Sequence, residues 1–226
     1  MTTKLKPYPK YKDSGIEWLG DVPEGWLVTK INHLFLDIGS GTTPPTTSQE
    51  YYSNGTVNWV NTGDLNDNYL FTSKKTIANS ALRDFSTLKV YPEGSIVVAM
   101  YGATIGKLAI LQISATTNQA CCVLQPLKAI NSKFIFYCLL ASRSYLIDLA
   151  YGAGQPNISQ DTIRSFKLPS PIKNQQTTIA TYLDTQTAKI DTLITKYQKL
   201  IALSKEKRTA LITAAVTGKI DVRECV

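Results

Sequence analysis

No proline or glycine occurs over residues 174–217, and no other part of the sequence has so long a stretch without them. Proline and glycine are the residues that most often end helices, so this stretch predicts one long helix that stops at Gly218. At 1.5 Å per residue, such a helix is about 65 Å long, several times the thickness of a small domain core. Because the rest of the chain cannot cover a helix of that length, much of its surface needs another partner.

Apolar side chains recur along this stretch at three- and four-residue steps, which is the spacing of a coiled-coil seam. Gln186, Ser204 and Lys207 interrupt the seam, and Ile194, Ile201 and Ile212 widen it beyond two positions. The pattern therefore favours a second helix packed along the seam residues, which are Ile179, Leu183, Ile190, Leu193, Tyr197, Leu200 and Leu211.

The chain before Pro169 has a different pattern. Short runs rich in Val, Ile and Ala, bounded by turn residues, predict strands over residues 57–60, 95–100, 107–113 and 121–124. Helical spacing occurs over residues 29–36 and 132–149. We expect an α+β protein, with a mixed α/β domain over residues 1–172 followed by one long coiled-coil-forming α-helix and a short tail over residues 173–226.

Composition narrows the class of protein. Hydrophobic residues make up 43% and charged residues 18% of the chain, which excludes bulk disorder. The formal net charge of +7 suits a polyanionic partner without requiring one.

No apolar run approaches the roughly 20 residues of a membrane span, and residues 1–10 lack the apolar core of a signal peptide, so we expect a cytoplasmic protein.

Cysteine and histidine give no sign of a metal site. The only histidine, His33, lies among apolar neighbours, and without an orienting carboxylate we favour a structural or surface role over catalysis. No C-x-x-C pair occurs, so we expect reduced packing residues at Cys121, Cys122, Cys138 and Cys225.

Motifs that would carry catalysis are missing from the sequence. Residues 43–46, Thr-Pro-Pro-Thr, lack the acidic or amide residue and the aromatic residue of an adenine-methylating motif. Residues 102–106 lack the third glycine of a nucleotide-binding loop and precede a strand, so we interpret them as a hairpin turn. The phosphate-binding, zinc-protease and serine-hydrolase motifs do not occur. We expect no catalytic residue, no cofactor and no enzymatic activity.

A set of strings, taken in order, resembles the DNA-specificity subunit of type I restriction-modification systems over essentially the whole chain. The strings are YKDSGIEWLGDVPEGW (11–26), GTTP (41–44), WVNTGDL (59–65), YGATIGK (101–107), ATTNQA (115–120), GQPNIS (154–159), YLDTQTAKID (182–191) and KEKRTALITAAVTG (205–218). The resemblance implies a target-recognition domain that reads one half of a split DNA site, followed by a spacer helix. In this family, separate methyltransferase subunits and a translocating restriction subunit carry the chemistry.

The sequence departs from the family pattern in one respect. A typical member has two recognition domains and two spacer helices, which pack antiparallel, whereas this sequence has one of each. The resemblance therefore implies a homodimer with a two-fold interface made by the seam residues. Such a dimer would read a palindrome interrupted by a gap that the helix sets. The implied partners are double-stranded DNA, methyltransferase subunits, the restriction subunit and a second copy, with no membrane.

The family does not fix which side chains touch bases. We nominate polar and aromatic loop residues as DNA contacts, while a solvated or capping role stays open for each of them: Thr42, Thr43, Tyr51, Tyr52, Lys74, Lys75, Arg83, Tyr101, Lys107, Arg143, Gln155 and Asn157. For Asn118 and Gln119 we expect buried hydrogen bonds that brace the following strand.

Two other functions stay open. One is an assembly or adaptor protein whose helix docks partners and whose loops bind no DNA. The lysines and arginine of the helix over residues 196–208 fit either a phosphate backbone or a solvated helix face. An enzyme with an unfamiliar site is the least favoured, because acid and base residues are not clustered.

Overall fold

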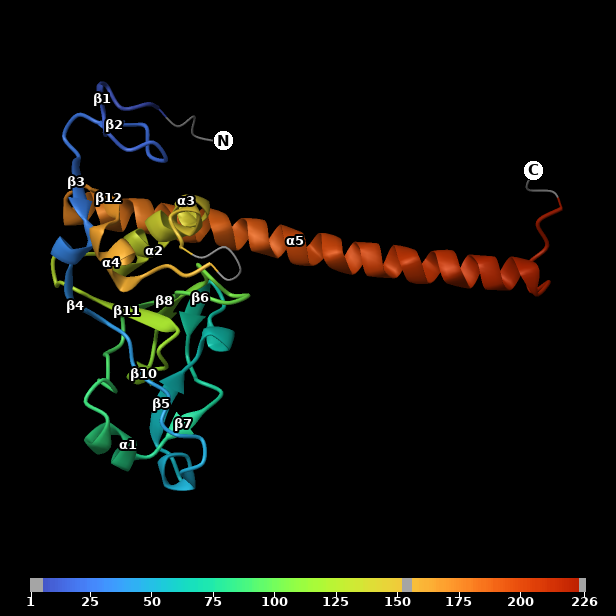
Figure 1. Cartoon of the computed structure of the whole chain (residues 1–226). Coiled ribbons are helices and arrows are strands. Elements are labelled where there is room, and N and C mark those ends of the chain that lie inside the picture. The colour runs from blue at the N-terminus through green and yellow to red at the C-terminus, as the bar shows by residue number, and fades with distance from the viewer. Residues whose placement is uncertain (1–5, 152–155, 224–226) are drawn as a thin grey trace. The chain divides into compact units, whose positions relative to one another are not determined.

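The computed structural model describes residues 6–151 and 156–223. The chain forms two compact units, Met1–Ala180 and Thr181–Val226. All of the described strands and shorter helices belong to the first unit, and one long helix, α5 (Lys173–Val216), begins there and continues through the second unit (Figure 1). The predicted mixed α/β fold with a long C-terminal helix is confirmed.

A five-stranded sheet forms the centre of the first unit. Its strands follow the order β4 (Phe35–Gly39), β11 (Cys121–Pro126), β8 (Ile96–Ala99), β9 (Leu108–Leu111) and β6 (Asn68–Leu70). Side chains alternate between the two faces of a strand, and both faces of the middle strands are buried, so their sequences read as continuous apolar runs. This is why the segments over residues 95–100, 107–113 and 121–124 were recognisable as strands. The segment over residues 57–60 is also a strand, but it belongs to a second sheet.

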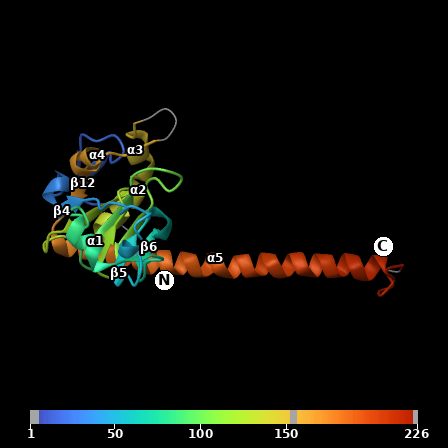
Figure 2. The ribbon, with the colours of Figure 1, turned by 60° about the horizontal axis from the view of Figure 1, so that its bottom comes forward.

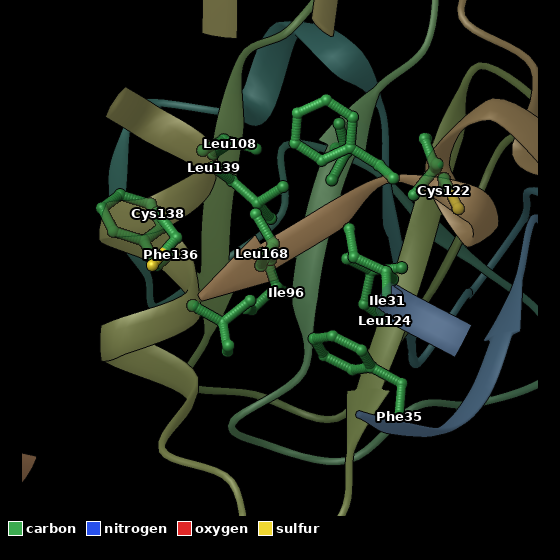
Figure 3. Packing of buried hydrophobic residues seen from close by; sticks show 14 of the residues in the cluster. Ile31, Phe35, Ile96, Leu108, Cys122, Leu124, Phe136, Cys138, Leu139 and Leu168 are labelled. Carbon is green, nitrogen blue, oxygen red and sulfur yellow. The ribbon is translucent and has the colours of Figure 1, made fainter. Parts of the chain in front are cut away.

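One face of this sheet packs against helices. Ile96, Leu108 and Leu124 belong to this core, which also holds Phe136 and Leu139 of α2 (Figure 3). The opposite face forms a second core with Val97, Ala109 and Cys121, among others. The helices of this part of the unit are α2 (Ser132–Ala141), α3 (Arg143–Asp148) and α4 (Gln160–Ser165).

A second sheet of three strands has a core of its own. In it, β5 (Val57–Val60) lies between β10 (Ala115–Thr117), which is parallel to it, and β7 (Thr76–Ile77), which is antiparallel. Trp59 and Ile77 pack there against Ala81 of α1 (Asn79–Asp84). Figures 1 and 2 place this sheet and α1 at the far end of the first unit from α2 and α4.

The predicted helix over residues 29–36 is wrong. This segment contains the end of β3 (Leu27–Lys30), a single 3-10 turn over Ile31–His33 and the start of β4. Strand β3 pairs with β12 (Lys167–Ser170), a partner far along the chain that the local pattern does not reveal. The 3-10 turn also places residues three apart on one side, so the burial of Ile31 and Leu34 imitates helical spacing. His33 is exposed.

The predicted helix over residues 132–149 is broken in two at Ser142. The Ser142 hydroxyl is buried and donates a hydrogen bond to the Cys138 carbonyl oxygen, at 2.9 Å. Hydroxyl groups that bond to the preceding turn weaken and bend helices, and here α3 starts on the next residue.

The long helix follows the prediction closely. It ends where Gly218 takes the left-handed conformation, with φ of +69°. The Gly218 and Lys219 amides then donate to the carbonyl oxygens of Ala215 and Ala214, a Schellman motif that satisfies the last turn. Among the described residues, no helix is both long enough and apolar enough to cross a membrane.

Exposure along α5 divides the seam residues. Ile179 packs against the main core of the first unit, and Leu183 is half-buried. From Ile190 onward the seam residues are exposed: Leu193 keeps 51% and Tyr197 60% of its surface open.

The remaining elements are the hairpin of β1 (Tyr11–Asp13) and β2 (Asp21–Pro23) and the short turns η2 (Gln49–Tyr51) and η3 (Thr62–Asp64).

Candidate nucleic-acid interface

The nominated DNA contacts fall into two groups, both in the first unit. Gln155 lies outside the described residues. One group surrounds the three-stranded sheet: Thr42, Thr43, Tyr51, Tyr52, Lys74, Lys75 and Arg83. The other surrounds the turn between β8 and β9: Tyr101, Lys107, Arg143 and Asn157. Contact with DNA stays a prediction for all of them, and their surroundings show which side chains are available for it.

The loop before η2 is held in place by several contacts. The Trp59 indole donates to the Thr42 carbonyl oxygen at 3.2 Å, and the Tyr52 hydroxyl donates to the Pro44 carbonyl oxygen at 2.5 Å. A Cβ atom on Gly41 would lie 1.8 Å from the Thr117 carbonyl oxygen, so only glycine fits this approach. These contacts fix the backbone that carries Thr42 and Thr43, both half-exposed.

Tyr51 and Tyr52 support this region rather than project from it. The Tyr51 hydroxyl donates to the Asp84 carboxylate at 3.1 Å, and this hydrogen bond is the main reason why the pKa of Tyr51 is raised. Its ring packs edge-on against Phe85, and the Tyr52 ring packs in the same way against Trp59. Both tyrosines are half-buried members of the small core beside the three-stranded sheet.

The two lysines between β6 and β7 differ in their surroundings. The Lys74 ammonium donates to the Gly63 carbonyl oxygen at 3.0 Å, and its backbone amide donates to the buried Asp64 carboxylate. Lys75 is exposed, and its side chain has no partner among the residues described. Lys75 is therefore the better phosphate donor of the two, while Lys74 also ties the loop to η3.

Phe71 was missed by the sequence analysis. Its side chain is 70% exposed and lies in the same loop as Lys75. The Ser73 hydroxyl donates to the Lys75 carbonyl oxygen at 2.7 Å, which helps to hold the loop. The available signal was an aromatic residue beside a pair of lysines, a combination suited to a nucleic acid because rings contact bases and ammonium groups contact phosphates.

The second group is built on the hairpin turn over residues 102–106, which is confirmed as the connection of β8 to β9. Gly102 and Gly106 have φ of +81° and +76°, which glycine adopts without strain. The Tyr101 backbone bridges to Asn157, so the turn and the segment before α4 lie side by side. Lys107, at the end of the turn, is exposed.

Arg143 is engaged inside the unit. Its guanidinium makes two contacts with the Asp67 carboxylate, one of them 3.1 Å from Nη1 to Oδ2. The aliphatic part of Arg143 also packs against Gly106, where a Cβ atom would be only 3.0 Å from its Cγ. The charge of Arg143 is therefore neutralised by Asp67, and the residue braces the turn.

Asn118 and Gln119 brace their surroundings, but less deeply than expected. The Asn118 side chain is half-buried and accepts a hydrogen bond from the Ala120 amide at 3.1 Å. Gln119 is exposed, and its side-chain oxygen accepts from the Thr43 hydroxyl at 2.6 Å. This contact joins the first loop to the segment between β10 and β11, which no local pattern indicates.

Three of the four cysteines lie in the described part of the chain, and their thiols are held in the protonated form by burial. Cys121, Cys122 and Cys138 are free and buried, and burial raises the pKa of the Cys122 and Cys138 thiols to about 12. Cys225 lies outside the described residues. Within residues 6–151 and 156–223, no group of three or more His, Cys, Asp or Glu side chains could hold a metal ion.

Comparison with known proteins gives a consistent family. The protein family described as "Type I restriction modification DNA specificity domain" matches residues 23–203 of this chain. The MjaIX specificity subunit of Methanocaldococcus jannaschii is 30% identical over 185 residues, which are 80% of this chain and 41% of that protein. The EcoR124I/EcoR124II specificity subunit of Escherichia coli is 26% identical over 85% of this chain and 47% of its own length.

Two solved structures share the fold. One, from work on complex assembly and conformational transition of the type I R-M system, has a TM-score of 0.71 at 17% identity and covers 91% of this chain and 48% of its own. The other, the HsdS subunit from Thermoanaerobacter tengcongensis, has a TM-score of 0.61 at 17% identity and covers 81% and 41%. The chain thus spans less than half the length of each of these relatives.

Proposed function

The chain belongs to the type I restriction-modification DNA specificity family, and we infer from this that its first unit recognises one half of a split DNA target. One observation carries the proposal: the family match covers residues 23–203, which include most of the mixed α/β unit and much of α5. Both parts of the chain thus correspond to the family, as the sequence resemblance implied.

The surface of the first unit supports DNA as its ligand. Arg83, Lys75 and Lys107 are exposed, and none has a side-chain partner among the residues described. Free cations of this kind contact phosphates, and they hold a protein in register on a duplex. The loops beside them are fixed by internal hydrogen bonds, so little conformational entropy is lost when they bind.

The second unit supports association with another chain. The apolar stripe of α5 leaves a large apolar area in water. Half or more of the surface is exposed for each of its residues Ile190, Leu193, Tyr197, Leu200 and Leu211. Contiguous apolar surface of this kind marks an interaction site. We propose that a second copy covers the stripe through a two-fold interface, so that the dimer reads an interrupted palindrome.

In this proposal the partner subunits, not this chain, carry out the reactions on DNA. In this proposal the dimer bound to DNA recruits methyltransferase subunits of the same system and, in the complete assembly, the restriction subunit. The chain itself supplies sequence specificity and is not an enzyme. The wide stripe and the basic residues of α5 leave surface for these additional subunits.

The test is methylation mapping. The chain and the methyltransferase subunit from the same system are produced together in a host that lacks adenine methylation, and methylated adenines are mapped across the genome. We expect one palindromic motif with an unread gap, and no methylation when the chain is omitted. A single uninterrupted motif would contradict the two-fold reading, and methylation without the chain would contradict its role in specificity.

A second measurement separates this proposal from an adaptor function. Duplex fragments with and without the mapped motif are titrated with the chain and the methyltransferase subunit together. A specificity subunit gives tighter binding to the motif, whereas an adaptor assembles with the methyltransferase but leaves both duplexes unbound.

A further inference from the structure

Two successive connections join the three-stranded sheet and the five-stranded sheet of the first unit (Figure 1). Residues 61–67 run from β5 to β6 and contain η3, and the loop over residues 71–75 runs from β6 back to β7. This loop exposes Phe71 and Lys75. Because neither residue belongs to a strand, the position of both side chains depends on the contacts that hold the loop.

A buried carboxylate lies where the two connections meet. Asp64, the last residue of η3, is 9% exposed, and among the residues described it is the only buried side chain that carries a charge. Carboxylates are costly to bury unless hydrogen bonds replace the lost water. Its Oδ2 accepts from the Asn61 amide at 2.9 Å, and its Oδ1 accepts from the Lys74 amide at 3.4 Å. Asp64 therefore places one oxygen on each connection.

Other contacts hold the end of the loop against β5. The Trp59 amide donates to the Lys75 carbonyl oxygen at 3.0 Å. The Ser73 hydroxyl lies 3.2 Å from Oδ1 of Asn58. The middle of the loop is instead tied to η3, where the Asp64 carboxylate meets the backbone of the loop.

We propose that Asp64 is a positioning residue for DNA recognition, whose carboxylate keeps the loop over residues 71–75 in its binding conformation before DNA arrives. A loop that is already ordered loses less conformational entropy on binding. The inference rests on the proposed function and adds the residue that prepares this part of the interface. Because Asp64 is buried, it acts through the loop.

The negative charge of Asp64 separates this role from a purely electrostatic one. Removing an acidic charge near a polyanion tightens binding when charge alone matters. Asp64→Asn keeps the size of the side chain, but its amide accepts from only one of the two backbone amides and faces the other with a donor. The positioning role therefore predicts weaker DNA binding, which is the opposite sign.

The first experiment follows the loop without DNA, by limited digestion with trypsin. Lys74 and Lys75 are trypsin sites inside the loop. We expect Asp64→Asn to raise the rate of cleavage after them about fivefold or more, because the loop opens more often. Cleavage after the exposed Lys107 is the control for global unfolding and should not change. Parent-like protection of the loop overturns the inference, whether or not the chain binds DNA.

The second experiment is a double-mutant cycle. Affinity for a duplex with the mapped motif is measured, with the methyltransferase subunit present, for Asp64→Asn, Phe71→Ala and the double variant. We expect Asp64→Asn to weaken binding about tenfold, and Phe71→Ala to have a much smaller effect in that background than in the parent chain, because a mobile loop no longer presents the ring. The matched control is Asp84→Asn, the same change at an exposed carboxylate, which should not weaken binding.

The outcomes separate this inference from the proposed function. Additive effects in the cycle, or binding by Asp64→Asn as tight as the parent or tighter, overturn the positioning role while DNA recognition stands. A parent chain that binds the motif no better than another duplex overturns the proposed function instead.

Urea denaturation shows whether each variant is folded at the assay temperature. Where Asp64→Asn is not folded, hydrogen exchange of the parent chain supplies the test. The Lys74 amide, which donates to Asp64, should exchange at least about tenfold more slowly than in an unstructured peptide of the same sequence. Exchange at the unstructured rate overturns the inference.

Discussion

The guanidinium of Arg143 pairs with the carboxylate of Asp67, and this contact joins α3 to the segment before β6, 76 residues earlier in the chain. Asp67 has a left-handed backbone, with φ of +58°, and its carboxylate also accepts a hydrogen bond from the Leu108 amide at 3.0 Å. One carboxylate therefore ties the start of β9 to α3, with the hairpin turn between them.

Replacing Arg143 should affect folding rather than DNA contact. Arg143→Ala leaves the half-buried Asp67 carboxylate without its cation, and we expect a loss of about 1–2 kcal/mol in the free energy of unfolding. Urea denaturation measures this loss. Arg83→Ala, which removes an exposed cation, is the control and should leave stability unchanged within about 0.5 kcal/mol. If Arg143→Ala instead lowers the salt dependence of DNA binding at unchanged stability, Arg143 contacts phosphate.

Lys75 is the lysine whose removal should report on phosphate contact alone. For Lys75→Ala we expect weaker DNA binding and a slope of log affinity against log salt reduced by about 1, because one fewer counterion is released. Lys74→Ala should in addition lower stability, since Lys74 donates to the Gly63 carbonyl oxygen. DNA-binding titrations at salt concentrations from about 50 to about 200 mM give the slope of log affinity against log salt. An unchanged slope for Lys75→Ala would remove it from the interface.

Phe71 should contribute to the affinity for DNA but not to the salt dependence of that affinity. Phe71→Ala removes an exposed ring, so we expect unchanged stability, about tenfold weaker binding and an unchanged salt slope. Leu36→Ala, at an apolar side chain of similar exposure on β4, is the matched control and should bind as the parent does. Equal affinity of both variants would show that Phe71 does not touch DNA.

Alkaline pH should destabilise the first unit through its buried thiols. Burial raises the pKa of Cys122 from 9.0 to about 12, so between these values the unfolded chain loses the thiol proton while the folded chain keeps it. Stability is therefore fully present below pH 9 and falls as the pH rises towards 12, by about 1.4 kcal/mol per unit for this one group.

Urea denaturation at several pH values between these limits tests this effect. Cys122→Ala should reduce the slope of stability against pH by that amount, even though it lowers stability at every pH. Cys138→Ala should act in the same way, because burial also raises the pKa of Cys138 to about 12. A slope that neither variant changes would mean that these thiols are not protected in the folded state.

The candidate interface was predictable only in part. The sequence located the loops, since proline, glycine and polar residues gather where strands end. Of the cations nominated as DNA contacts, Lys75 and Lys107 are exposed in the structure, and their contact with DNA stays a prediction. It could not show that the Tyr51 hydroxyl bonds to Asp84. Whether a polar side chain is free for DNA depends on neighbours brought together by the fold, and these lie tens of residues away.

The sequence by itself determined the elements whose signal is local. The absence of glycine and proline fixed the span of α5, Gly218 fixed its end, and the unbroken apolar runs fixed β8, β9 and β11. Only the tertiary structure decided that residues 29–36 form β3, a 3-10 turn and β4, and that Asp67 neutralises Arg143. Backbone periodicity acts between near neighbours, whereas strand pairing and ion pairing join segments that are distant in the chain, so only the folded structure can reveal them.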